Sequence, residues 1–170
     1  MSEKSMFFNS TDGDVREYSA ADFADCLSGI CSDGVLEGLE VTPTNSKVNI
    51  SAGKAVIKGY IYVLDDIKVI TASSGNAKRF DRVVLKLDLA NRNISAVVRT
   101  GTNIPPALGE NEISLAVVTV QTNGAVTGVE DTREYSRDYK NLYNKPIYCG
   151  TSAPRKSLGN DGDIYVQYES

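Results

Sequence analysis

The sequence contains no histidine and no tryptophan among its 170 residues. Without histidine the chain cannot build Ser-His-Asp or Cys-His nucleophile systems, histidine-ligated zinc or a histidine general base. A wall-degrading hydrolase would then need a carboxylate pair in a cleft, and no carboxylate spacing in the chain indicates one. We therefore expect a protein that is not an enzyme and that carries no cofactor and no metal.

Cysteine is scarce, with only Cys26, Cys31 and Cys149. Cys26 and Cys31 fall five residues apart on an expected helix, a rotation of about 500°, so their side chains diverge. An odd number of cysteines without a Cys-x-x-Cys spacing is typical neither of a zinc site nor of a disulfide framework. We expect three free thiols and folding in a reducing cytoplasm.

Long apolar runs and basic clusters are also missing. No apolar run approaches 18 residues, and residues 1–8 lack the features of a secretory signal. The net charge is −4, the isoelectric point is about 4.9, and the lysines and arginines are scattered. A mildly acidic surface disfavours polyanionic partners, so we expect no nucleic-acid binding and no membrane insertion.

From residue 35 onward, short apolar runs and turn residues follow one another about every ten positions. Asn123-Gly124 predicts a hairpin whose turn needs positive φ. The clearest strand covers residues 82–89 and would place on one face the side chains of Val83, Leu85, Leu87 and Leu89. The pattern predicts a mainly β protein, a small antiparallel β-sandwich or barrel with one N-terminal α-helix and an extended C-terminal segment.

One helix is expected before these strands. Ser19 is followed three residues later by Asp22, which is the spacing of a capping box. An apolar helical face follows, formed by Phe23, Leu27, Ile30 and Cys31, and residues 32–34 end the helix. We favour packing of this face on a sheet over docking on a neighbouring subunit.

These elements divide the chain into three parts. Residues 1–34 form an N-terminal attachment segment with the helix, and residues 35–135 form the β-sandwich domain. Residues 136–170 form a connector and a C-terminal strand at 163–168, which is too short to fold alone and must pair with another segment.

Three acidic motifs invite a ligand-binding interpretation. Asn160-Asp161-Gly162-Asp163 lacks the acidic positions and the spaced glutamate of a calcium loop, so we interpret it as a tight turn. Asp12-Gly13-Asp14 is interpreted in the same way. Asp65-Asp66 would point to opposite faces of a strand, so a hairpin turn between Val63 and Ile67 is favoured over a split acid–base pair.

Charged pairs accompany two of the apolar strands, Asp81-Arg82 and Asp131 with Arg133. We hypothesise that Arg82 and Asp131 form a structural ion pair at one end of the sandwich. The alternative is two unrelated surface pairs, each contributing about 0–1 kcal/mol.

Three stretches resemble tail proteins of phages and prophages of Gram-positive bacteria. The first is similar to the opening of baseplate and receptor-binding proteins and comprises Phe8-Asn9-Ser10, Gly13-Asp14, Tyr18, Ala21-Asp22-Phe23 and Asp33-Gly34-Val35. The second is similar to tail structural proteins and comprises Gly53-Lys54-Ala55, Gly59-Tyr60-Ile61-Tyr62, Arg79-Phe80-Asp81-Arg82-Val83-Val84-Leu85, Glu112-Ile113-Ser114-Leu115-Ala116 and Asp131-Thr132-Arg133. The third resembles the Tyr-x-x-Leu-x-Asn-Lys-Pro connector of tail fibres and is Tyr139-Lys140-Asn141-Leu142-Tyr143-Asn144-Lys145-Pro146, with Tyr143 in place of a smaller residue.

The resemblance implies a structural or assembly component of a phage tail, in the baseplate or the attachment end of a fibre. It implies a virion protein that is assembled in the host cytoplasm as a homo-oligomer, a trimer first, in contact with other tail proteins. Aromatic residues are favoured at such interfaces, so the tyrosines could pack between subunits. The alternative is that they pack on the chain's own sandwich. The candidate subunit-interface residues are Phe7, Phe8, Phe23, Leu27, Tyr139, Leu142, Tyr143, Pro146 and Tyr148.

A function of another class is a carbohydrate-binding module that recognises host cell-wall glycan. Small β-sandwiches often have this role, and it requires an exposed aromatic platform. The absence of tryptophan, a favoured sugar-stacking residue, counts against it.

Overall fold

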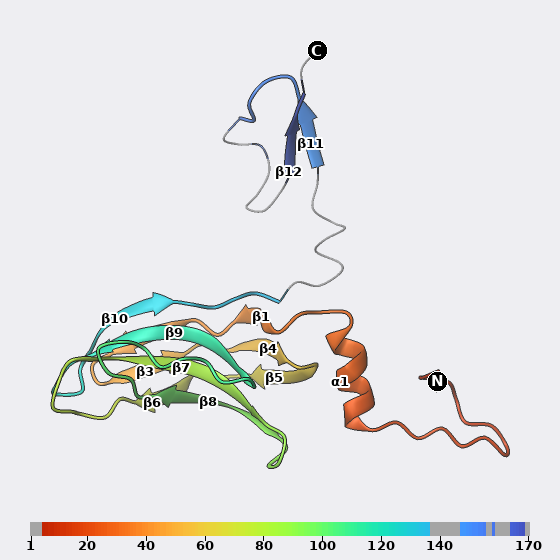
Figure 1. Cartoon of the computed structure of the whole chain (residues 1–170), viewed down its shortest axis with the longest axis horizontal. Coiled ribbons are helices and arrows are strands. Elements are labelled where there is room, and N and C mark those ends of the chain that lie inside the picture. The colour runs from red at the N-terminus through yellow and green to blue at the C-terminus, as the bar shows by residue number, and fades with distance from the viewer. Residues whose placement is uncertain (1–4, 137–146, 156–157, 159–163, 169–170) are drawn as a thin grey trace. The chain divides into compact units, whose positions relative to one another are not determined.

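A computed structural model of the chain describes residues 5–136, 147–155, 158 and 164–168. The chain falls into two compact units, residues 1–136 and residues 137–170. The first unit is mainly β with one described helix and forms a small antiparallel β-sandwich (Figure 1), which confirms the predicted fold class. Among the described residues, no helix has the length and apolar character needed to cross a membrane.

Helix α1 (Ala20–Ser28) begins with the predicted capping box. The Ser19 hydroxyl accepts a hydrogen bond from the Asp22 backbone N–H at 3.3 Å, and the Asp22 carboxylate accepts one from the Ser19 backbone N–H at 2.8 Å. Two N–H groups at the helix start are thereby satisfied. The helix ends at Ser28 rather than at the predicted Cys31, because Gly29 caps it and its N–H is shared between two carbonyls of the last turn.

The predicted apolar face of this helix is not its buried face. Ala24 is the residue of α1 that is buried, whereas Phe23 and, just beyond the helix, Ile30 are exposed. Ala24 packs on the turn between strands β4 (Gly53–Ile57) and β5 (Tyr60–Leu64), where a Cβ atom added to Gly59 would lie 1.8 Å from the Ala24 carbonyl oxygen. Gly59 also has a φ of +76°, so both close approach and backbone conformation require glycine.

The larger sheet of the first unit has four antiparallel strands in the order β10-β9-β7-β8. The strands are β7 (Arg79–Asp88), β8 (Asn93–Arg99), β9 (Glu112–Val120) and β10 (Val126–Asp131). Gly124, with a φ of +83°, turns the chain between β9 and β10, as the Asn-Gly pair predicted. Val83, Leu85 and Leu87 are buried as predicted, but Leu89 is exposed because β7 ends at Asp88 and the following turn carries the side chain outward.

Two three-stranded antiparallel sheets complete the sandwich. One has the order β1-β4-β5, with β1 (Gly34–Gly38), β4 (Gly53–Ile57) and β5 (Tyr60–Leu64). The other has the order β2-β3-β6, with β2 (Val41–Thr44), β3 (Lys47–Ile50) and β6 (Lys68–Thr71).

The predicted hairpin across Asp65-Asp66 is wrong. Residues 65–67 link β5 to β6, and these strands belong to different sheets. β5 pairs back on β4 instead, because Lys58 and Gly59 both adopt positive φ, at +48° and +76°, and close a two-residue turn.

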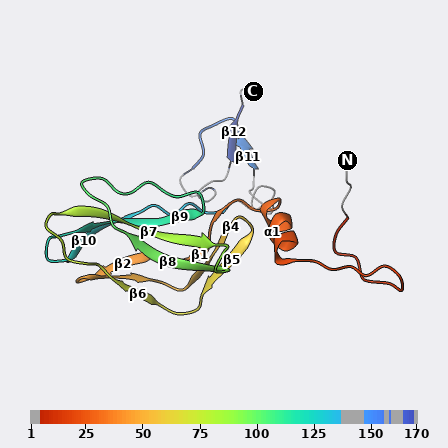
Figure 2. The same cartoon turned by 60° about the horizontal axis from the view of Figure 1, so that its bottom comes forward.

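One hydrophobic core joins the three sheets. Figure 2 shows the larger sheet as a layer over the strands of the smaller sheets. The larger sheet contributes the buried side chains of Val83, Leu85, Leu115, Val118 and Val120, and the smaller sheets contribute those of Val35, Val48, Ile50, Ala55 and Ile57. This core holds β7 and β9 rigidly and thereby positions the loops and edges described below.

The second unit contains two short strands, β11 (Ile147–Gly150) and β12 (Ile164–Gln167), which pair in parallel. The predicted final strand is therefore present as β12, and the segment with which it pairs is β11. The Tyr165 hydroxyl donates a hydrogen bond to the Ser152 carbonyl at 2.6 Å and ties β12 to the residues that follow β11.

Candidate interaction surfaces

One ion pair lies inside the first unit. Arg79 and Asp81 stand two residues apart on β7, on the same face of the strand, and their side chains are 8% and 1% exposed. The Arg79 Nε donates hydrogen bonds to both Asp81 carboxylate oxygens, at 2.9 and 3.1 Å, and its Nη2 donates to the Ser73 carbonyl. The Gly101 N–H also donates to Asp81 at 3.0 Å. The pair thus links β7 to two loops, which is a structural role.

The predicted ion pair between Arg82 and Asp131 does not form. The Arg82 guanidinium donates to the Pro106 carbonyl at 2.8 Å and to the Ser114 hydroxyl at 3.0 Å. Asp131 pairs with Arg133 at 2.6 Å, because residues two apart on an extended chain lie on the same side. Hydrogen bonds from the Arg133 side chain lower the pKa of the Asp131 carboxyl.

An aromatic cluster gathers where the N-terminal arm meets α1. The Phe7 ring centroid lies 5.2 Å from that of Tyr18 and 5.0 Å from that of Phe23. The Tyr18 hydroxyl accepts a hydrogen bond from the Phe8 N–H and donates one to the Phe8 carbonyl, which holds the arm in place. We call Phe7, Phe8, Tyr18 and Phe23 the N-terminal aromatic cluster.

This cluster leaves much of its apolar surface in solvent. Phe7, Phe8 and Phe23 are 44%, 61% and 54% exposed, and Leu27, one turn after Phe23 on α1, is half-buried. The Phe7 ring is tilted by 41° and 39° against its two neighbours, so these rings do not form the flat platform on which a sugar stacks. Exposed apolar clusters on a folded protein are typical of contact surfaces.

Four further apolar side chains are exposed on β5, on the link that follows it and on β6. They are 49% to 59% exposed, and we call them the β5–β6 row: Ile61, Val63, Ile67 and Val69. Both strands stand at an edge of their sheets. The intervening Tyr62 points the other way, into the core.

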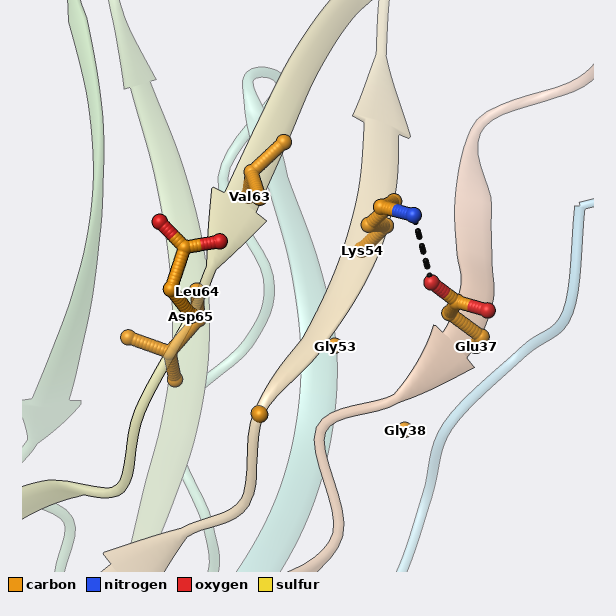
Figure 3. Close-up of a pocket in the computed structure, with 8 residues that line it drawn as sticks. Glu37, Gly38, Gly53, Lys54, Val63, Leu64 and Asp65 are labelled. Carbon is orange, nitrogen blue, oxygen red and sulfur yellow. Dashed lines mark ion pairs between the residues drawn. The ribbon is translucent and has the colours of Figure 1, made fainter.

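A shallow hollow of about 430 Å³ adjoins this row (Figure 3). Lys54 of β4 and Glu37 of β1 line one side of it, with Nζ and Oε1 2.7 Å apart, while Val63 and Asp65 line the other side. The hydrogen bond with Glu37 raises the pKa of the Lys54 ammonium. An open, shallow hollow suits contact with another surface better than enclosure of a substrate.

Ligand sites suggested by the acidic motifs gain no support from the geometry. Within the ranges that the structure describes, no three His, Cys, Asp or Glu side chains come together as a metal site. Asp12 and Gly13 form the predicted tight turn, with Thr11 and Asp14 exchanging backbone hydrogen bonds at 3.1 and 3.0 Å. Residues 160–163 lie outside the described residues, and the three cysteines carry free thiols.

Of the predicted interface residues in the C-terminal segment, the structure describes only Tyr148. Tyr139, Leu142, Tyr143 and Pro146 lie outside the described residues, and Tyr148 is half-buried on β11. A role for this tyrosine-rich segment between subunits therefore stays a prediction.

Two features escaped the sequence analysis although the sequence signals them. Arg79 and Asp81 share the period-two face of the apolar residues from Val83 onward, which places both in the core. The β5 run Tyr60-Ile61-Tyr62-Val63-Leu64 is apolar on both faces, so one face must be covered by something other than the core or stay exposed.

Among the residues that the structure describes, the first unit exposes apolar side chains in the N-terminal aromatic cluster and in the β5–β6 row, and the second unit exposes Ile164 and Val166 of β12. Comparison with known proteins adds no relative, since no family model, no curated protein and no solved structure matches the chain.

Proposed function

We propose that the chain is a structural component of a phage or prophage tail, located in the baseplate or at the attachment end of a fibre. It works as a homo-oligomer, a trimer first, and contacts other tail proteins in the virion. The motifs that resemble tail proteins support this role. The observation that carries it is the N-terminal aromatic cluster, in which Phe7, Phe8 and Phe23 remain about half exposed.

The mechanism is burial of apolar surface between copies. Phenylalanine and tyrosine rings contribute strongly to subunit interfaces because they bury large apolar areas. Permanent interfaces usually bury more than about 2,000 Å², which is more than a few rings supply. The tyrosine-rich C-terminal segment, with Tyr139, Tyr143 and Tyr148, is the proposed source of further contact area.

The arrangement of the first unit fits such a building block. The Tyr18 hydroxyl, bonded to both backbone groups of Phe8, holds the aromatic residues in a fixed conformation before any partner binds. Preorganised contact groups lose less conformational entropy on association. The sandwich behind them supplies a rigid core rather than an enclosed site.

Removing the aromatic side chains tests this proposal. We expect the double variant Phe7→Ala/Phe23→Ala to lose the wild-type oligomer and to sediment as one or two copies, because the contact area at the cluster is gone. Analytical ultracentrifugation of the full chain measures the mass. Ile104→Ala, at an exposed apolar residue of the loop between β8 and β9, is the control and should keep the wild-type mass. A double variant that keeps the wild-type mass would contradict the proposal.

A further inference from the structure

A second hollow lies in the first unit where two loops meet beside the start of β7. Residues 72–78 link β6 to β7, and residues 100–111 link β8 to β9. Residues 73–79 and 100–103 line a volume of about 450 Å³, which we call the loop hollow. This volume is within the range of small-molecule binding sites.

Arg79 brings unused hydrogen-bond donors to the loop hollow. A guanidinium group carries five N–H donors. The Arg79 Nε donates to the Asp81 carboxylate, and Nη2 donates to the Ser73 carbonyl at 2.7 Å and to the Ser73 hydroxyl at 3.2 Å. Among the residues that the structure describes, Nη1 has no hydrogen-bond partner, so its two N–H groups are free for a ligand.

The Nη1 atom can be reached through the loop hollow. The Arg79 side chain is only 8% exposed, yet it lines the hollow. In the described part of the chain, the fully enclosed side-chain atom without a partner is the Asn111 Oδ1, so Nη1 keeps contact with solvent. Gly75 leaves this approach open, because a Cβ atom added there would lie 2.6 Å from Nη1.

The charge of the lining favours an anion. Residues 73–79 and 100–103 include Lys78 and Arg79 but no aspartate or glutamate, although the whole chain has a net charge of −4. Asp81 is 1% exposed and holds Arg79 from the core side, out of reach of a ligand. Lys78 is exposed, its ammonium lies 5.6 Å from the centroid of the Phe80 ring, and it has no ion-pair partner among the described residues.

Two neutral side chains of the lining add further donors. The Ser73 oxygen accepts from Arg79, which leaves its hydroxyl hydrogen available. The Asn103 Oδ1 accepts from the Thr102 hydroxyl at 3.2 Å, which leaves the Nδ2 group as a donor. Several donors with a surplus of positive charge suit a ligand group that only accepts hydrogen bonds, and phosphate and carboxylate oxygens are such acceptors.

We propose that the loop hollow binds a small molecule through a phosphate or carboxylate group. The Arg79 Nη1 donates hydrogen bonds to the oxygens of this group, and Lys78 adds a second positive charge. Arg79 is already held by Asp81 and Ser73, so little conformational entropy is lost when the ligand binds. The remaining volume receives the part of the molecule that carries the anionic group.

This site goes beyond the proposed function. It is built from two loops of the sandwich, and it requires neither the tail role nor contact between copies at the N-terminal aromatic cluster. Its failure would leave the oligomer unchanged, so the two proposals can be tested separately.

The test is a titration of the isotope-labelled full-length chain, with inorganic phosphate and with acetate in turn, at neutral pH and at an ionic strength held constant with sodium chloride. We expect saturable changes in the NMR signals of backbone amides in residues 73–79 and 100–103 with at least one of the two anions. The anion that saturates identifies the group that is recognised. Changes with neither anion, or changes that grow linearly without saturation, would overturn the proposal.

Two variants test the roles of the lining residues. Lys78→Met should raise the dissociation constant roughly fivefold, since it removes one of the two positive charges. Lys86→Met is the control, because it removes an exposed lysine from the other half of β7. Equal effects of the two variants would show that the anion responds to net charge alone and would overturn the site.

Gly75→Ala tests the approach to Nη1 without a change of charge. The added methyl group should abolish saturation, because it occupies the space in front of Nη1. Gly109→Ala is the matched control, since its added Cβ also meets a charged side chain, the Glu112 carboxylate at 3.1 Å, but outside the loop hollow. Wild-type affinity in the Gly75→Ala variant would contradict binding at Arg79.

Discussion

Replacement of Asp81 by alanine is expected to lower the free energy of unfolding by about 3–5 kcal/mol, because it leaves a buried cation without its anion. Arg79 is almost fully buried and directs its Nε at the Asp81 carboxylate. The Gly101 N–H, which donates to the same carboxylate, would lose its partner as well. Urea unfolding followed by circular dichroism measures the change.

Two further variants show whether the loss comes from burial of the unpaired charge. Asp14→Ala removes an exposed ion pair with Arg16 and should lower the free energy of unfolding far less than Asp81→Ala does. Arg79→Met combined with Asp81→Leu removes both charges and should be more stable than Asp81→Ala alone. Equal losses for Asp81→Ala and Asp14→Ala would show that the pair is not buried as described.

Leu85→Ala is expected to destabilise the first unit by about 2–5 kcal/mol. Leu85 is fully buried at the middle of β7, within the core shared by all three sheets, so truncation removes apolar contacts and leaves a cavity. The same urea titration measures this change, through a lower midpoint.

Leu89→Ala provides the matched control for Leu85→Ala. The side chain of Leu89 is 54% exposed just beyond the end of β7, so its truncation should change stability by no more than about 0.5 kcal/mol. A similar loss at both positions would mean that Leu89 belongs to the core, as its sequence period alone suggests.

Local signals in the sequence predicted local structure well. Ser19 and Asp22 form the capping box that their spacing indicates, because the bonds involve only residues of one helical turn. The turn at Gly124 follows from one residue's tolerance of positive φ. Period-two alternation identified Val83, Leu85 and Leu87 as core residues.

Features that depend on distant residues were less predictable. Leu89 continues the apolar period of β7, but only the position of the following turn decides that it leaves the core. The partner of β5 depends on whether Lys58-Gly59 or Asp65-Asp66 makes the tight hairpin, and both dipeptides suit a turn. The ends of α1 and of the strands depend in the same way on packing that a single sequence does not specify.

The candidate surfaces were likewise predictable from the sequence only in part. Phe7, Phe8 and Phe23 could be selected from the sequence as contact residues, and they are exposed. The predicted ion pair was wrong because it matched Arg82 with Asp131 across the sheet. Arg82 instead donates to the Pro106 carbonyl, and Asp131 pairs with Arg133. The β5–β6 row was overlooked because a run that is apolar on both faces is also what a fully buried strand would have.

The molar mass of the unmodified chain in solution tests most directly whether the protein is a self-assembling building block. Sedimentation equilibrium between about 1 and 50 µM reports this mass and its dependence on concentration. We predict a mass that is a multiple of the 18.4 kDa of one copy, with three copies as the first expectation. A mass of 18.4 kDa at every concentration would contradict the account, because the exposed aromatic cluster would then have no partner in a second copy.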